Sequence, residues 1–118
     1  MTDEKILEMF PYLKNKKKVK ITVLKIFNPK EVFEDPPAHH VDPWGPCPMY
    51  VEGQEIIVNE SGYMPEGFCD AAWHTIWGNV RTLASGGDFP YYKDKKGTVI
   101  SCCSDGLRPV VFQLERIE

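Results

Sequence analysis

The chain has 118 residues, of which 42% are hydrophobic and 26% are charged. This balance is typical of one compact folded domain, and it excludes a disordered or collagen-like chain. The formal net charge of −3 argues against a dedicated nucleic-acid-binding protein, which usually has a basic face. Its apolar runs fall well short of the roughly 18 residues of a membrane span, and its charged start differs from a signal peptide. We therefore expect a cytoplasmic protein that binds neither nucleic acid nor a membrane.

Residues 1–17 are predicted to form an N-terminal helical extension. Apolar side chains recur at near-helical spacing over residues 6–13, and Pro11 should end or bend this short helix early. We interpret the lysine-rich residues 14–18 as a solvated surface rather than an anion-binding patch. Residues 18–118 are then expected to form a single domain.

Four segments of this domain have the patterns of β-strands. Alternating apolar and polar residues predict a first strand at 19–27 with one buried face, and residues 54–59 predict a short second strand. Residues 98–103 and 109–117 predict two further strands, joined as a hairpin around Asp105-Gly106. A two-residue turn of this kind would need Gly106 at positive φ.

The clearest helix is predicted at residues 69–84, where Ser85-Gly86-Gly87 supplies the stop. Residues 28–49, the proline-rich segment, hold six of the ten prolines, so we expect no regular element there. The order helix, β, β, helix, β, β predicts an α+β fold, with a small, mostly antiparallel sheet packed on one face by the main helix. The apolar stripe of that helix consists of Ala72, Trp73, Ile76, Val80, Leu83 and Ala84.

The four cysteines point most directly to chemistry. Their spacings match no standard zinc or ferredoxin motif, and a cytoplasmic chain of this size should keep them as thiols. Side chains alternate faces along a strand, so at most one of the adjacent Cys102 and Cys103 should join a given site. Cys102 shares its parity with Ile100, so we expect Cys102 in the core and Cys103 in the site. The remaining two are Cys47 and Cys69.

Cys69 lies where the predicted helix begins. The first-turn N–H groups and the helix dipole favour a thiolate or ligated sulfur there, whereas burial on the apolar stripe would make it a packed, inert residue. Asp70 and His74 are spaced i and i+4, so the carboxylate can orient the imidazole as a ligand or general base requires, or the two form a surface contact. Trp77 and Arg81 repeat this spacing and predict a cation–π contact. The candidate catalytic residues are Cys69, Asp70, His74 and Arg108.

Two motifs carry a resemblance. Gly-Phe-Cys stands at 67–69, and Cys-Cys-x-Asp-Gly-x-Arg-Pro-Val-x-Phe stands at 102–112. With matching stretches elsewhere in residues 18–118, they make the chain similar to a family of small uncharacterised bacterial and archaeal proteins. The chain departs from the family pattern at Ala71 and Tyr91, where the family has tryptophans. The resemblance implies no activity, cofactor or catalytic residue.

The first functional hypothesis is a cysteine-centred site that binds a metal. Thiolate-rich ligand sets suit zinc or an iron–sulfur cofactor, and the proline-rich segment is long enough to reach the start of the main helix. The candidate ligands are Cys47, Cys69, Cys103, His39 and His40.

The second hypothesis is an apolar pocket that binds a non-metal small molecule, in a binding protein or a small enzyme, with Arg108 as an anchor for an anion. A third is an accessory subunit whose exposed aromatic residues contact a protein partner or further copies of the chain. The sequence has no Ser-His-Asp order, phosphate loop or dinucleotide motif, so enzyme and binding protein both stay open. The candidate pocket residues are Trp44, Trp73, Trp77, Tyr91 and Tyr92.

Overall fold

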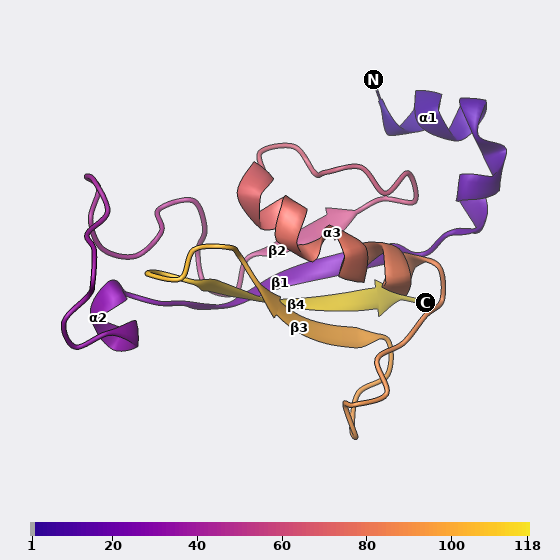
Figure 1. Ribbon diagram of the computed structural model, residues 1–118. Helices are drawn as coiled ribbons and strands as arrows, with labels where there is room; N and C mark the ends of the chain where they lie inside the picture. Colours follow the sequence, from indigo (N-terminus) through magenta and orange to yellow (C-terminus); the bar gives the residue numbers. More distant parts are fainter. Residues whose placement is uncertain (1) are drawn as a thin grey trace.

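A four-stranded antiparallel sheet forms the centre of the molecule, and one long helix lies across one of its faces (Figure 1). The computed structural model describes residues 2–118, and its strand order is β2-β1-β4-β3. The predicted α+β fold is confirmed. The elements are α1 (Asp3–Met9), the 3₁₀ helix η1 (Pro11–Asn15), β1 (Lys18–Ile26), α2 (Pro29–Val32), β2 (Glu55–Val58), α3 (Asp70–Ala84), β3 (Thr98–Cys102) and β4 (Val110–Ile117).

The alternation of residue types along the strands decides which face of the sheet is buried. Ile21 of β1 lies opposite Ile56 of β2 and Leu114 of β4, so apolar side chains line up across three strands on one face. Thr22 and its partner Gln113 lie on the other face. A slip of one residue would exchange the two faces, so burial of the apolar face holds the strands in this register.

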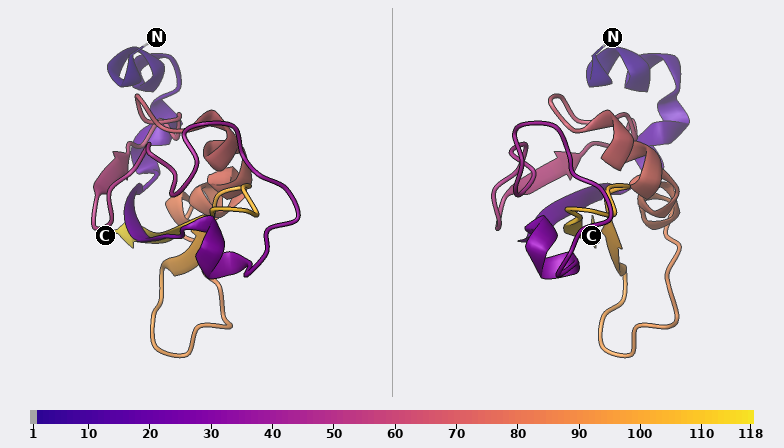
Figure 2. Two further views of the ribbon diagram at one scale, coloured as in Figure 1. Left: turned by 90° about the vertical axis from the view of Figure 1, so that its left-hand side faces the viewer. Right: turned by 60° about the vertical axis from the view of Figure 1, so that its left-hand side comes forward.

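The predicted apolar stripe of α3 is the surface that packs on the sheet, against β1, β3 and β4. Ile76 and Val80, near the middle of the helix, are completely buried there. The two views of Figure 2 agree that α3 lies on one side of the strands, with α1 and the loop between α3 and β3 at opposite ends of the molecule. Packing of this one helix therefore completes the core.

The C-terminal end of α3 is closed by two glycines and an arginine. The Gly86 N–H donates to the Leu83 carbonyl and the Gly87 N–H to the Thr82 carbonyl, which is the Schellman arrangement, and Gly86 has the positive φ of 91° that it requires. Arg116 of β4 donates to the carbonyl oxygens of Leu83 and Gly87 at 3.2 and 2.6 Å. A cation at this end of the helix also complements the dipole.

The N-terminal segment packs on the domain through both apolar and polar contacts. Ile6 of α1 and Leu13 of η1 are buried. Asp3 accepts hydrogen bonds from the side chains of Asn59 and Ser61, which follow β2. The expected short helix therefore forms, with Thr2 as its N-cap, and it is anchored by residues far along the chain.

The proline-rich segment contains one regular element, which the sequence analysis did not expect. Pro29 occupies the first position of the short helix α2, where a missing N–H costs nothing. Asn28 and Glu31 form a reciprocal capping box: the Asn28 side chain accepts from the Lys30 N–H at 3.1 Å, and the Asn28 N–H donates to Glu31 at 2.9 Å. The rest of the segment is irregular, as predicted.

The predicted hairpin of β3 and β4 is confirmed, but its turn differs from the prediction. Gly106 does not have a positive φ, and the connection from Cys103 to Pro109 is longer than a two-residue turn. The Asp105 side chain accepts from the N–H groups of Leu107 and Arg108 at 2.9 and 3.3 Å. A side chain that binds its own backbone two residues on closes the loop without a left-handed glycine.

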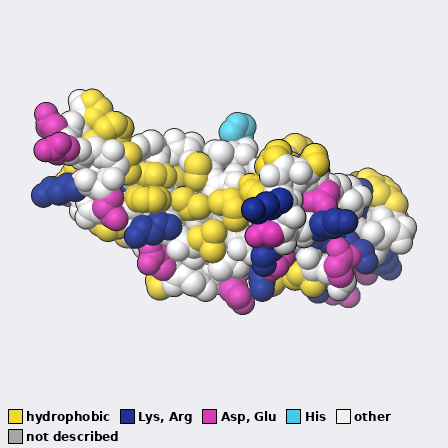
Figure 3. Space-filling view, turned by 90° about the horizontal axis from the view of Figure 1, so that it is seen from below, with side chains coloured by type: hydrophobic (Ala, Val, Ile, Leu, Met, Phe, Trp, Pro, Cys, Tyr) yellow, Lys and Arg dark blue, Asp and Glu magenta, His cyan; other side chains and the backbone are white. Residues whose placement is uncertain are grey.

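The face of the sheet opposite α3 carries exposed apolar residues among charged ones. Leu24, Ile57 and Ile100 point to this side, and Lys20 lies between Glu55 and Glu115 at 3.5 and 3.6 Å. Viewed from below, away from α3, apolar side chains form a band flanked by charges (Figure 3).

Replacing Ile76 by Asp should unfold the protein. An unpaired carboxylate in the core costs several kcal/mol, a large part of the roughly 5–15 kcal/mol that stabilises a domain. Circular dichroism during thermal unfolding measures this loss. Thr75→Asp, an exposed change on the same helix, should melt within a few degrees of the parent. An Ile76→Asp variant with the melting temperature of the parent would contradict the docking of α3.

Two glycine substitutions should differ in their effect on stability. Gly86→Ala should cost roughly 1 kcal/mol, because alanine is strained at positive φ. Gly106→Ala should stay within about 0.5 kcal/mol of the parent, because a Cβ there meets open space and the backbone lies outside the left-handed region. Urea denaturation of both variants checks this, and equal losses would show that the loop is strained.

Candidate functional site

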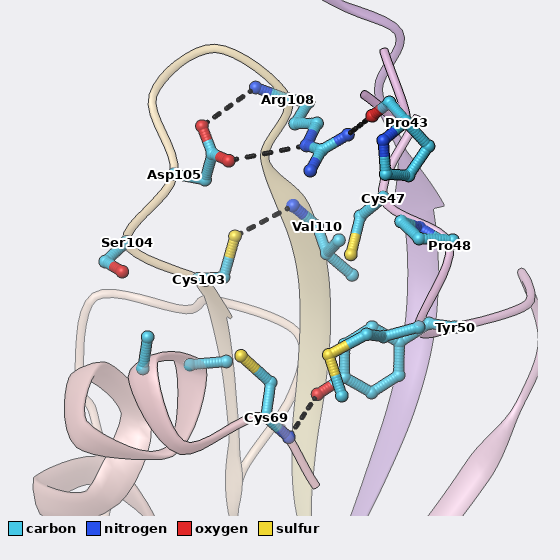
Figure 4. A pocket seen from close by; sticks show the side chains of 13 residues that line it. Pro43, Cys47, Pro48, Tyr50, Cys69, Cys103, Ser104, Asp105, Arg108 and Val110 are labelled. Atoms are coloured by element: carbon cyan, nitrogen blue, oxygen red, sulfur yellow. Dashed lines mark hydrogen bonds and ion pairs between the residues drawn. The ribbon is translucent and has the colours of Figure 1, made fainter. Parts of the chain in front are cut away.

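Three of the four cysteines line one cavity of about 480 Å³. Cys47 comes from the proline-rich segment, Cys69 from the residue before α3, and Cys103 from the residue after β3. Their sulfur atoms point into the same space in Figure 4. None of the three is fully buried, and all pack against the hydrophobic core.

Cys103 is held in place by the end of the β3–β4 ladder. Its N–H donates to the Val110 carbonyl at 3.0 Å, and the Val110 N–H donates to the Cys103 sulfur at 3.3 Å (Figure 4). A backbone N–H aimed at a sulfur stabilises negative charge on it. Cys103 is therefore oriented for use as a thiolate or a ligand.

Cys69 brings the N-terminal end of α3 to the cavity. It is the N-cap of the helix, and no side chain caps the first turn. Ala71 and Ala72 from that turn line the cavity, so the positive end of the helix dipole faces the cysteines. The Cys69 N–H itself donates to the Tyr50 hydroxyl oxygen at 3.0 Å.

Tyr50 forms the floor of the cavity. The side chain is only 7% exposed and packs edge-on against Phe112, with ring centroids 5.5 Å apart, and against Phe68 at 5.6 Å. Burial raises the pKa of Tyr50 to about 12, and the three cysteines add to the shift. The phenol therefore keeps its proton throughout the physiological pH range.

The buried guanidinium of Arg108 positions the proline-rich segment above the cavity. Arg108 is 7% exposed, and its Nη1 donates to the carbonyl oxygens of Pro43 and Gly45 at 2.8 and 3.1 Å. Its Nε lies 3.5 Å from a carboxylate oxygen of Asp105. These contacts hold the chain just before Cys47 and occupy Nη1 and Nε. The anchoring of an anion by Arg108 stays a prediction.

The expected orientation of Cys102 is wrong. Cys102 is exposed on the face of the sheet opposite α3, together with Ile100, whereas Val99 and Cys103 face the helix side. Cys102 and Ile100 do lie on the same face of β3, as predicted, but that face is the exposed one. The free edge of β3 is covered by Tyr92, whose hydroxyl oxygen accepts the Ile100 N–H at 2.9 Å.

The two histidines of the proline-rich segment lie outside the cavity lining. The His39 ring lies tilted against the Trp44 ring, with centroids 5.1 Å apart. His40 lies beside Arg108, with ring nitrogens 3.3 and 3.4 Å from Nη2. Within residues 2–118, no group of three or more His, Cys, Asp or Glu side chains is arranged around a single metal ion.

The expected aromatic pocket is divided. Trp73 and Trp77 line a second cavity of about 480 Å³ together with Asp70 and His74, and it shares Ala71 and Ser104 with the cysteine cavity. Trp44 and Tyr91 lie elsewhere, the latter largely exposed. The predicted cation–π contact is present, with the Arg81 guanidinium 5.1 Å from the Trp77 ring.

Sequence reasoning missed the part played by Tyr50 and by the carbonyls that Arg108 binds. Tyr50 follows Cys47 by three residues, but nothing in that stretch indicates which way its ring points. Asp105 was predicted only as a turn residue and Arg108 as a catalytic or anion-anchoring residue, and neither was predicted as the partner of the other. A carbonyl oxygen carries no signal in a sequence, so the partners of a buried arginine emerge only from the fold.

Comparison with protein-family models, curated proteins and solved structures finds no match for this chain. None of the helices in the described residues is long and apolar enough to span a membrane. The assignment of a function therefore rests on the site itself.

Replacing Arg108 by Lys should release the proline-rich segment. Lysine keeps the charge but lacks the planar fork that reaches two carbonyls and Asp105, so we expect a loss of about 1–3 kcal/mol and faster proteolysis within residues 36–46. Urea denaturation and limited proteolysis measure these effects. Arg81→Lys, which preserves a cation beside Trp77, is the matched control. Equal behaviour of the two variants would contradict the clamp.

Proposed function

We propose that the protein binds an iron–sulfur cluster in the cysteine cavity, with Cys47, Cys69 and Cys103 as ligands. The observation that carries this proposal is the convergence of three thiols from three separate segments on one apolar cavity. Thiolates are the ligands that iron–sulfur clusters require. The three thiols come from a loop, a helix start and a strand end, so the site forms only when the chain folds.

A cluster suits this arrangement better than a single zinc ion. A tetrahedral zinc site needs its ligands within one coordination sphere, and no such group occurs in residues 2–118. In a [4Fe–4S] cluster each cysteine ligates its own iron, so the three sulfurs would surround a larger volume. A cavity of about 480 Å³ between them supports the larger guest.

The surroundings of the three sulfurs favour negative charge. The first turn of α3 faces the cavity without a side-chain cap, and the Val110 N–H donates to Cys103. The Arg108 guanidinium and the Asp105 carboxylate that pairs with it both line the cavity, so their charges largely offset each other there. Apolar residues complete the wall and would shield a cluster from water, which is one of the factors that set its reduction potential.

The fourth cysteine of the chain is excluded from this site by its position. Cys102 points to the opposite face of the sheet, so only three cysteines can ligate. A cluster with four irons would then have one iron without a cysteine ligand. That iron would be open to a ligand other than these cysteines.

Anaerobic purification of the full chain followed by assay of iron and acid-labile sulfide tests the proposal. The wild-type chain should contain both, with the visible absorbance of a cluster. Cys47→Ser, Cys69→Ser and Cys103→Ser should each lose most of the iron, because a serine hydroxyl is a poor substitute for a thiolate.

Cys102→Ser is the matched control, since it makes the same change to an exposed residue on the other face. It should retain the iron and sulfide of the wild-type chain. If the wild-type chain contains zinc instead of iron, and the three serine variants lose that zinc, the site binds a single zinc ion and not a cluster. A chain that binds neither metal would leave the cavity as a pocket for an organic ligand.

A further inference from the structure

The floor of the cysteine cavity carries a hydrogen-bond donor that the protein itself does not use. The Tyr50 hydroxyl oxygen accepts the Cys69 N–H, and in the described part of the chain this is the one hydrogen bond of that side chain. Its own proton therefore has no acceptor among the described residues. A buried polar hydrogen without an acceptor is costly, so its presence in a core residue calls for a partner.

The other buried polar groups around the cavity are already paired. Arg108 is bound to Pro43, Gly45 and Asp105, and Asp105 also accepts two backbone N–H groups. Tyr50 is thus the buried donor that is left for whatever the cavity holds. Figure 4 shows its hydroxyl beside Cys69, at the end of the cavity that the Cys69 sulfur occupies.

We propose that the Tyr50 hydroxyl donates a hydrogen bond to the Cys69 sulfur that ligates the cluster and thereby raises the reduction potential of the cluster. The inference rests on the proposed function. Reduction adds negative charge to a cluster and its thiolates, and a donor aimed at sulfur stabilises that charge more strongly in the reduced state. Tyr50 acts on the cluster through the Cys69 sulfur and is not itself a ligand.

Tyr50→Phe tests this role, because it removes the hydroxyl and leaves a ring that can still pack against Phe68 and Phe112. The full chain is reconstituted anaerobically, its iron and sulfide are measured, and its potential is determined by a redox titration followed by electron paramagnetic resonance. The variant should hold as much cluster as the wild-type chain and have a more negative potential. Tyr92→Phe, which removes a hydroxyl at the far edge of β3, should leave the potential unchanged.

A second measurement avoids any loss of folding in the Phe variant. Growth on 3-fluorotyrosine makes all five tyrosines of the chain stronger donors without removing a side chain. The wild-type cluster should then shift to a more positive potential.

The outcomes separate the two proposals. A wild-type chain that takes up no iron and sulfide overturns the cluster and the role of Tyr50 together. A cluster whose potential is the same with and without the Tyr50 hydroxyl overturns only the tyrosine. A shift of equal size in Tyr92→Phe, or no response to fluorotyrosine, also overturns it.

Discussion

The buried charge of Arg108 is the constraint on which the site depends. A guanidinium that is almost completely removed from water must have its donors paired, or the folded state would lose several kcal/mol. The pairing partners are the backbone carbonyls of Pro43 and Gly45 and the carboxylate of Asp105. Satisfying one charge therefore fastens the irregular proline-rich segment to the β3–β4 loop. Tyr50, three residues beyond Cys47, holds the same stretch of chain from the other side, because its ring is buried against Phe68 and Phe112.

The groups around the cavity have opposite effects on negative charge at the cysteine sulfurs. An apolar wall disfavours negative charge on a sulfur, whereas a helix N-terminus and a backbone N–H directed at sulfur stabilise it. The structure supplies the first at Cys69 and the second at Cys103. A cavity used only for packing would gain nothing from them, since a neutral thiol packs as a small hydrophobe.

Prediction from the sequence succeeded where the pattern was local. It failed where the buried face of a strand had to be distinguished from its exposed face. The stripe of α3 and the alternation in β1 are periodic patterns that leave one solution. The orientation of Cys102 depended on which face of β3 is buried, and the outward Ile100 made the wrong face look apolar. Gly106 looked like a hairpin glycine, but the Asp105 side chain closes the loop instead. The packing of α3 on the sheet decides which face of β3 is buried, and the hydrogen bonds of Asp105 decide the form of the loop.

By itself, the sequence determined the type and order of α1, α3 and the four strands, because helix caps, apolar periodicity and glycine stops act over a few neighbouring residues. It also marked Cys47, Cys69 and Cys103 as separate candidates. The tertiary structure decided that these three meet while His39 and His40 do not. The reason is physical: the meeting point is set by the register of β3 with β4, the docking of α3 and the partners of one buried arginine. Each of these is a contact between distant residues, which no local pattern encodes.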